Sequence, residues 1–277
     1  MKTFNKIAEL QKELQLLQAK GKTIGFVPTM GALHPGHISL VEMARNYNDI
    51  VVVSIFVNPI QFNNPEDLKK YPRTFETDVA LLEKAQCDFI FYPEVEEMYP
   101  EATTEKYDFG KLETLLEGAC RPGHFNGVGV VVKRLFDIVR ADQAYFGKKD
   151  FQQLAIIRKL VEIENIPIEI IAGETKREKD GLAMSSRNVR LTRLERTKAP
   201  QLYANLQFTK VNKTEKSPAE LEELAIANLS SNFKVEYFKI CDGNSLQSIT
   251  GWNETEYPVA LVAAQIGSVR LIDNLEL

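Results

Sequence analysis

Two of the chain's three histidines, His34 and His37, stand three positions apart in the segment PTMGALHPGH at residues 28–37. Imidazoles at this spacing can ligate a metal, bind a phosphate group or simply begin a helix. Zinc is the weaker interpretation, because His124 is the only other histidine and no nearby cysteine completes a ligand set. On these residues alone, a phosphate site and a plain helix start both stay open.

The residues around the two histidines suit an anion. They lie between an apolar run and an amphipathic one, where unpaired backbone N–H groups and the helix dipole attract negative charge. Pro35 suits the first position of a helix, and Gly31 and Gly36 leave the backbone open to a ligand. Because the positive end of a helix disfavours imidazolium, we expect neutral rings that donate hydrogen bonds, with either tautomer possible.

A second polar cluster, YFGKKDFQQL at residues 145–154, also follows an apolar run. Lys149 in this cluster can neutralise a phosphate. Asp150 can cap the following helix or bind a ribose hydroxyl, and capping is the favoured interpretation from the local residues. Gln153, one helical turn further, faces the same way as Asp150 and can bind a polar substrate.

Two further segments carry weaker signals, and the well-known phosphate loops are missing. DGLAMSSRN at residues 180–188 combines two hydroxyls with a guanidinium, which suit phosphate oxygens, although alone it is an ordinary polar loop. VNPIQF at residues 57–62 supplies Asn58 and Gln61, amides that more often form turns. GKT at residues 21–23 lacks the earlier glycine of a P-loop and precedes its strand, and no GxGxxG is present.

The pattern of apolar residues predicts the framework that must position these clusters. Strands are expected at residues 23–28, 50–57, 88–93, 143–146 and 167–172, and helices at about 35–46, 74–85, 129–140 and 150–164. Apolar strands that alternate with helices predict a parallel sheet covered on both faces, a Rossmann-like fold. Ligands in such sheets bind at the carboxyl ends of the strands, so the clusters should converge on one cleft.

Both ends of the chain differ from this repeating pattern. Residues 1–22 have apolar residues at helical spacing, which predicts an amphipathic docking helix and not a signal peptide. After about Lys176 the sequence is rich in charge, and strands are expected at residues 235–240 and 258–274 with a turn at 267–268. We therefore expect an α/β protein, with a Rossmann-like domain at residues 1–176 and a smaller α+β domain at 177–277 that carries the MSSRN loop.

The composition excludes several classes of protein. The 277 residues are 44% hydrophobic and 26% charged, which indicates a globular chain with a substantial core. The net charge of -4 arises from intermixed acidic and basic residues, so we expect no nucleic-acid partner. The three cysteines are isolated, and the longest apolar run, IVVVSIFV, is too short to span a membrane. These features predict a cytoplasmic enzyme.

Taken together, the motifs resemble those of the pantothenate synthetase family, the pantoate–β-alanine ligases. The motifs that carry the resemblance, in the family's order over nearly the whole chain, are PTMGALHPGH, VNPIQF, YPRT, EGACRPGHFNGV, FGKKDFQQL, REKDGLAMSSRN and RLIDN. The resemblance implies a cytoplasmic homodimer whose Rossmann-like domain carries a HIGH-type signature, here HPGH, below a smaller lid domain. It also implies a reaction in which ATP and Mg²⁺ activate pantoate as pantoyl adenylate, β-alanine displaces AMP, and pyrophosphate is released.

The resemblance also assigns roles to individual residues. His34 and His37 would contact phosphates, with His37 as the family's usual proton donor, and Lys149 would complete the catalytic set. Asp78 would help hold Mg²⁺, although an aspartate near a helix start needs no metal to explain it. The implied contacts to pantoate and β-alanine are Gln61, Gln153 and Asn58. The implied ATP contacts are Met30, Gly31, Ala32, Leu33, His34, Pro35, Gly36, His37, Gly147, Lys148, Lys149, Asp150, Lys176, Met184, Ser185, Ser186 and Arg187.

Two departures from the family pattern and two other functions also need consideration. Lys148 stands where glutamate or glutamine is more usual, which would add positive charge near ATP, and Lys176 replaces a usually apolar residue. Another nucleotidyltransferase with a HIGH-type motif would transfer a nucleotide to a phosphate and stop there. A nucleotide-binding module without catalysis would use the histidines only to begin a helix.

Overall fold

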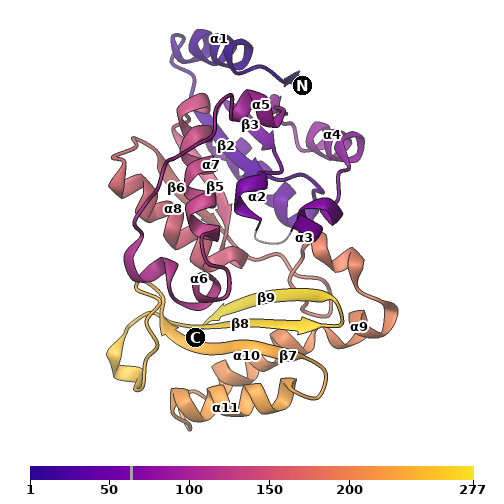
Figure 1. Ribbon diagram of the computed structural model, residues 1–277, viewed down its shortest axis with the longest axis vertical. Coiled ribbons are helices and arrows are strands. Elements are labelled where there is room, and N and C mark those ends of the chain that lie inside the picture. The colour runs from indigo at the N-terminus through magenta and orange to yellow at the C-terminus, as the bar shows by residue number, and fades with distance from the viewer. Residues whose placement is uncertain (63–64) are drawn as a thin grey trace.

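The computed structural model describes residues 1–62 and 65–277, and this part of the chain contains two β-sheets (Figure 1). The larger sheet has the strand order β1-β4-β3-β2-β5-β6, and every pairing in it is parallel. Its strands are β1 (Lys2–Phe4), β2 (Ile24–Thr29), β3 (Ile50–Ile55), β4 (Phe89–Phe91), β5 (Gln143–Gly147) and β6 (Glu169–Gly173). The predicted Rossmann-like architecture is therefore confirmed.

The strand order contains one reversal, which decides where a ligand can bind. The chain runs outward from β2 through β3 to β4, and then resumes with β5 on the other side of β2. In parallel α/β sheets, the crevice beside such a reversal lies outside the carboxyl ends of the strands. The segments that follow β2 and β5 therefore meet at this point.

Helices cover both faces of the sheet because its apolar strands need burial on both sides. Phe26 and Val52 belong to a core that includes residues of α1, α7 and α8, whereas Val27 and Val53 belong to a core shared with α2 and α4. The helices of this part are α1 (Ile7–Gln18), α2 (Pro35–Tyr47), α3 (Pro65–Lys70), α4 (Phe75–Lys84), α5 (Val95–Met98), α6 (Leu116–Cys120), α7 (His124–Val139) and α8 (Phe151–Ile163). Short 3-10 turns are η1 (Pro59–Gln61), η2 (Gly110–Glu113) and η3 (Lys148–Asp150).

The structure corrects the prediction at the N-terminus. Residues 2–4 form the edge strand β1, which pairs with β4, and the helix begins only at Ile7. Phe4 therefore belongs to the sheet, where its ring meets the edge of the Phe89 ring with centroids 5.5 Å apart. Leu10 and Leu14 are buried, as the helical spacing predicted. The strand was missed because its pairing partner, β4, is distant in sequence.

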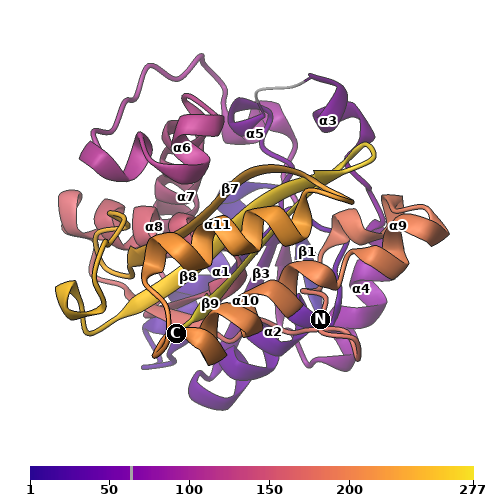
Figure 2. The same cartoon turned by 90° about the horizontal axis from the view of Figure 1, so that it is seen from below.

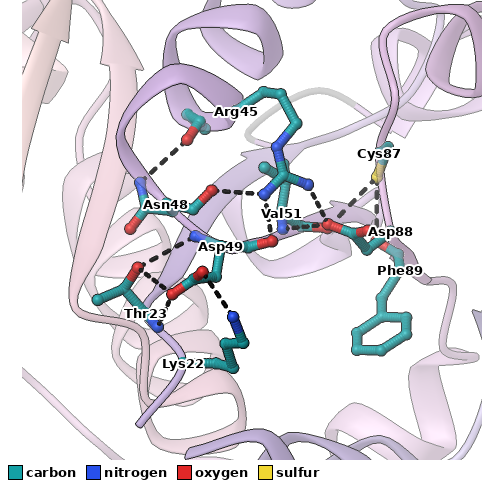
Figure 3. A network of polar contacts seen from close by, with 10 residues as sticks. Lys22, Thr23, Arg45, Asn48, Asp49, Val51, Cys87, Asp88 and Phe89 are labelled. Atoms are coloured by element: carbon teal, nitrogen blue, oxygen red, sulfur yellow. Dashed lines mark hydrogen bonds and ion pairs between the residues drawn. The ribbon is translucent and has the colours of Figure 1, made fainter.

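A polar network holds the amino ends of β3 and β4, away from the carboxyl-end crevice (Figure 3). Asp49 and Asp88 directly precede these two strands. Asp49 binds Lys22 Nζ and Thr23 N, both at 3.0 Å, and Asp88 accepts a hydrogen bond from Arg45. Lys22 and Thr23 of GKT thus bind a carboxylate of the chain itself, in agreement with the rejection of GKT as a phosphate loop.

The remainder of the chain packs against the carboxyl ends of the larger sheet (Figures 1 and 2). The antiparallel strands β7 (Lys234–Asp242), β8 (Pro258–Ile266) and β9 (Val269–Glu276) form the smaller sheet in that order. Helices α10 (Gln201–Asn212) and α11 (Pro218–Leu229) cover its outer face, as the view from below shows (Figure 2). The short elements are η4 (Ser186–Arg190), α9 (Arg193–Lys198) and η5 (Trp252–Glu254). The predicted smaller α+β unit is confirmed.

None of the helices in the described ranges combines the length and the apolar character that crossing a membrane requires.

Candidate active site

His34 and His37 cap the start of α2 together. His34 is the N-cap residue, and its Nδ1 accepts a hydrogen bond from Gly36 N at 3.2 Å. His37, three residues on, accepts the backbone N–H of His34 at its own Nδ1, at 3.3 Å. The ring centroids lie 4.0 Å apart. Pro35 occupies the first helical position, as predicted.

This capping fixes the tautomer of both rings. Because each Nδ1 accepts an N–H, the proton of the neutral imidazole resides on Nε2. Burial and, to a smaller extent, the nearby positive charge of Lys149 together lower the pKa of His34 to about 4. Burial, His34 and Lys149 together lower the pKa of His37 to about 3. Both rings are therefore neutral at physiological pH, and each can donate from Nε2 to a phosphate oxygen.

The turn between β2 and α2 is shaped by Asp78. Its carboxylate accepts the backbone N–H groups of Ala32 at 2.9 Å and Leu33 at 2.8 Å. Gly31 and Ala32 both have a positive φ, 78° and 50°, so these two residues adopt the left-handed conformation. The hydrogen bonds to Asp78 stabilise this turn. A Cβ on Gly36 would approach the His34 ring to 2.9 Å, so this glycine makes room for the imidazole. The two glycines thus serve the geometry of the turn, a role that the local sequence did not predict.

The turn after β5 places Lys149 and Asp150 beside the histidines. Lys149 Nζ lies 3.9 Å from Asp150 Oδ2. Asp150 precedes α8 but its side chain forms no cap hydrogen bond, so the interpretation favoured from local residues was wrong. The side chain of Asp150 is half exposed, and the residue lines the cavity next to the histidines.

Lys148 differs from Lys149 in its contacts. Its Nζ pairs with Glu174 Oε1 at 2.6 Å and with Glu276 Oε1 at 2.8 Å. These carboxylates offset its charge, and its side chain is absent from the lining of the cavity next to the histidines. The positive charge that the sequence led us to expect near ATP at Lys148 is therefore accompanied by two carboxylates of the chain.

Gln61 is held at the end of η1 by three neighbours. Asn58, which is almost fully buried, donates to Gln61 Oε1 at 3.4 Å and to Gly127 O at 3.1 Å. Gln61 Nε2 lies 2.9 Å from the sulfur of Met30. The third histidine, His124, donates from Nδ1 to Gln61 O at 2.8 Å. Asn58 and His124 therefore hold the turn that presents the Gln61 side chain.

The loop that contains residues 184–187 is tied to both parts of the chain. Met184 N donates to Lys176 O at 2.9 Å, and Ser185 caps η4. From the larger unit, Tyr71 brings its hydroxyl to 3.4 Å from Ser186 Oγ. The guanidinium of Arg187 lies 5.8 Å from the centre of the Tyr71 ring.

Most of the predicted site residues line one cavity of about 210 Å³ at the β2/β5 reversal. They are Met30, His34, Gly36, His37, Asn58, Gln61, Gly147, Lys149, Asp150, Gln153, Lys176, Met184, Ser185, Ser186 and Arg187. A second cavity of about 750 Å³ between the two units shares Lys149, Asp150, Gln153, Ser185 and Arg187 with the first. The predicted residues outside the first lining are Gly31, Ala32, Leu33, Pro35, Lys148 and Asp78.

Asp78 does not fit the role of a metal ligand suggested for it. Its carboxylate already accepts two backbone N–H groups and the hydroxyl of Thr74, and the residue is almost fully buried. Within the described residues, no group of three or more His, Cys, Asp or Glu side chains is placed to hold a metal. Asp78 therefore shapes the turn before α2.

Several residues near the cavities were missed as functional candidates. His124 was considered only as a third zinc ligand, and Tyr71 and the pair Asp273–Asn274 lay in motifs to which no role was assigned. His124 and Tyr71 contact the Gln61 turn and the MSSRN loop directly. Asn274 contacts the backbone at Lys149. The available signal was the motif itself, since local periodicity carries no information on contacts between distant segments.

Comparison with known proteins identifies the family. The model of the family described as pantoate-beta-alanine ligase matches residues 2–276. The pantothenate synthetase of Azobacteroides pseudotrichonymphae genomovar. CFP2 is 50% identical over 278 residues, which cover 99% of each chain. The pantothenate synthetase of Porphyromonas gingivalis strain W83 is 48% identical, with 100% of this chain and 99% of that protein covered.

Solved structures agree with the sequence comparison. The crystal structure of pantothenate synthetase from Thermus thermophilus has a TM-score of 0.93 at 44% identity, covering 100% of this chain and 99% of that one. The pantoate-beta-alanine ligase from Francisella tularensis, complexed with beta-gamma ATP and beta-alanine, has a TM-score of 0.84 at 35% identity, covering 100% and 97%. With the family model matched from residue 2 to residue 276, this chain belongs to the pantoate–β-alanine ligase family.

Proposed function

We propose that this chain joins pantoate to β-alanine with the free energy of ATP, forming pantothenate, AMP and pyrophosphate through a pantoyl adenylate. One observation carries the proposal. His34, His37 and Lys149 line one cavity at the strand reversal of a chain that matches the ligase family over residues 2–276. A carboxylate and an amine do not condense in water, so the carboxyl oxygen must first become part of a leaving group.

Two displacements achieve this condensation. A pantoate carboxylate oxygen attacks the α-phosphorus of ATP, forming an O–P bond as the bond to pyrophosphate breaks. The amine of β-alanine then attacks the acyl carbon of pantoyl adenylate, the bond from that carbon to the AMP oxygen breaks, and the nitrogen loses a proton. Negative charge grows on phosphate oxygens in the first step and on the acyl oxygen in the second, where preorganised donors lower the barrier.

His34, His37 and Lys149 supply the groups that would stabilise this charge. The neutral rings donate Nε2–H to phosphate oxygens, and the ammonium of Lys149 contributes a full positive charge. Bound phosphate would raise the low pKa of each ring by stabilising the imidazolium. This change allows His37 to act as the proton donor that the family resemblance implies.

The remaining candidates form the walls of the site. The backbone of Met30 to His37 and of Gly147 to Asp150 would contact ATP, with Asp150 on the ribose and Lys176 contributing through its backbone. The residues that would close over the nucleotide are Met184, Ser185, Ser186 and Arg187.

The amides of Gln61 and Gln153 would bind pantoate. Asn58 would act beside them by holding Gln61, because its own polar atoms are engaged by the chain. β-Alanine must approach the acyl carbon from the same region, and the cavity shared by the two units provides space next to Gln153.

Mg²⁺ would enter as part of the MgATP substrate. The ion is held mainly by phosphate oxygens and water in many nucleotide sites, which suits a site where Asp78 is engaged by backbone N–H groups. We also propose that residues 1–176 and 177–277 act as two domains, the second as a lid. We also propose that the protein is a homodimer in the cytoplasm, as the family resemblance implies. Its intermixed acidic and basic residues agree with the absence of a nucleic-acid partner.

Product analysis tests the function. The protein is incubated with MgATP and pantoate, with and without β-alanine, and the products are identified by mass spectrometry. Pyrophosphate and pantoyl adenylate should form only when pantoate is present, and pantothenate and AMP only when β-alanine is added. A nucleotidyltransferase that stops after nucleotide transfer would form no amide, and a binding module would form no product at all.

A further inference from the structure

Two neighbouring residues in the second half of β9, Asp273 and Asn274, contact two separate walls of the nucleotide site. Both are buried, with 4% and 7% of their surface exposed. Asn274 contacts the turn after β5, and Asp273 contacts the segment that leads to the MSSRN loop. One short piece of the smaller unit thus joins segments that are more than 20 residues apart in sequence.

Asn274 binds the two backbone carbonyls that lie on either side of the Lys149 Cα. Its Nδ2 donates to Lys148 O and to Lys149 O, both at 2.9 Å. The amide nitrogen carries two hydrogens, so it can satisfy both carbonyls at once. Its own backbone N–H is also fixed, since it donates to Asp273 Oδ1 at 2.8 Å.

Asp273 forms a bidentate ion pair with Arg177. The distances are 2.6 Å from Nη1 to Oδ2 and 2.9 Å from Nη2 to Oδ1. The same guanidinium donates to Gly181 O and Asn274 O, both at 3.1 Å. It also lies over the ring of Tyr203, 3.8 Å from its centre. Such a planar, multiply bonded arrangement fixes the guanidinium in one orientation.

Arg177 in turn orders the segment from Lys176 to Met184. This segment folds back on itself, with an antiparallel bridge between Arg177 and Ala183. The hydrogen bond from Met184 N to Lys176 O closes its open end. The ion pair with Asp273 therefore fixes the base from which residues 184–187 project toward the cavity.

We propose that Asp273 and Asn274 are positioning residues for the nucleotide site. Asn274 fixes the backbone that carries Lys149, and Asp273 fixes the segment that carries Met184. This inference rests on the proposed function, because it assumes that the turn at Lys149 and the loop at residues 184–187 both bind ATP.

The local sequence around Lys149 explains why such support is needed. The turn η3 has only three residues, and the Asp150 side chain forms no cap hydrogen bond at the start of α8. Lysine has four rotatable side-chain bonds, so the place of its ammonium depends on a well-fixed backbone. A displacement of about 1 Å in a reacting group can cost on the order of 100-fold in rate.

A double-mutant cycle on nucleotide affinity tests the Asn274 contact. Calorimetry would measure MgATP binding to the wild type, Asn274→Ala, Lys149→Ala and the double variant. We expect Asn274→Ala to weaken binding roughly tenfold when Lys149 is present and less than twofold when it is absent, because the two residues act through one contact. The same loss in both backgrounds would overturn the proposal.

Asn205→Ala provides the matched control. Asn205 is a buried residue of α10 in the same unit, and its Nδ2 also donates to a backbone carbonyl, that of Gln201, at 2.9 Å. Its loss should lower stability without changing MgATP affinity. An equal loss of affinity would show that any loosening of the smaller unit weakens binding, which would overturn a specific role for Asn274.

Two further variants complete the design. If thermal unfolding shows that Asn274→Ala is not folded, Asn274→Ser keeps one donor and takes its place in the cycle. Arg177→Lys keeps the positive charge beside Asp273 but cannot form the bidentate ion pair, and it should weaken MgATP binding several-fold. Unchanged affinity would overturn the Asp273 part of the proposal. The double-mutant cycle measures MgATP binding directly. It therefore supports or overturns the positioning roles even if the product assay finds no pantothenate.

Discussion

His37 Nδ1 accepts the backbone N–H of His34, which leaves the Nε2–H of His37 for a ligand. The two rings stand with centroids 4.0 Å apart, and His34 uses its own Nδ1 in the same way on Gly36. The helix-start and phosphate-site interpretations of this pair are thus compatible. One nitrogen of each ring caps the helix, and the other is available for chemistry.

The Nε2–H donor of His37 and the ammonium of Lys149 should each be required for turnover. We expect His37→Ala and Lys149→Ala to lower the pantoate-dependent release of pyrophosphate by roughly 10²- to 10³-fold, the scale for one preorganised donor in a transition state. Lys159→Ala, at a surface ion pair with Glu162 on the same helix as Gln153, should leave the rate unchanged. Turnover near that of the wild type in both site variants would remove these roles.

Asp78 should stabilise the fold and leave the metal requirement unchanged. Asp78→Asn replaces an acceptor of two backbone N–H groups, which should lower the free energy of unfolding by about 2 kcal/mol. Asp137→Asn, at an exposed pair with Lys133, should change it by less than about 0.5 kcal/mol. Urea unfolding and a titration of the rate with Mg²⁺ would measure both properties. Wild-type stability with a tenfold weaker response to Mg²⁺ would restore Asp78 as a metal ligand.

Gly127 should be required for pantoate binding because of its contact with the Gln61 turn. A Cβ at this position would lie 2.9 Å from Gln61 Cα and from Ile60 O, so Gly127→Ala must displace the turn. We expect the KM for pantoate to rise roughly tenfold, which corresponds to about 1.4 kcal/mol.

Gly129→Ala is the matched control for this prediction. It lies on the same helix, and its Cβ would meet the rings of Phe109 and Tyr107 at 2.9 and 3.0 Å. It should lower stability by about 1–3 kcal/mol without changing the KM for pantoate. Steady-state kinetics and thermal unfolding would measure the two effects, and an equal rise of KM in both variants would argue against a special role of the Gln61 turn.

The three histidines should make the free protein less stable in mild acid. Burial lowers the pKa of His34 and His124 to about 4 and that of His37 to about 3, from an ordinary value of 6.5. As the pH falls from about 6.5 to about 4, the unfolded chain binds these protons first, so the free energy of unfolding must fall. The contribution is fully present only above about pH 6.5.

Urea unfolding at several pH values would check this dependence. His37→Gln removes one of the three groups, so the difference in stability between the wild type and this variant should change steadily between pH 6.5 and pH 4. A difference independent of pH would show that His37 titrates normally in the folded protein.

The positions of the predicted strands and long helices were accurate where periodicity is strong. Apolar strands such as Ile50–Ile55 need burial on both faces, and this need is visible in the local composition. The edge strand at residues 2–4 was missed because its partner is distant in sequence. Helix α7 begins at His124, five residues before the predicted start, because glycines in its first turns obscure the helical pattern.

The sequence indicated some residues of the candidate site by their type and place, but it did not predict the contacts of others. His34, His37 and Lys149 were found because their residue types and their places after strands suit phosphate. The capping role favoured for Asp150 from its local residues was wrong. The ion pairs of Lys148 could not be predicted, because Glu174 and Glu276 lie far from it in sequence.

The sequence by itself determined the α/β class, the family resemblance and the polar clusters that follow the strands, because these features depend on periodicity and on motifs within short segments. The tertiary structure alone decided the tautomers of His34 and His37, the turn held by Asp78 and the support that Asn274 gives to Lys149. Each of these depends on a hydrogen bond with a defined distance and direction. Such geometry arises only when the chain folds and brings distant groups together.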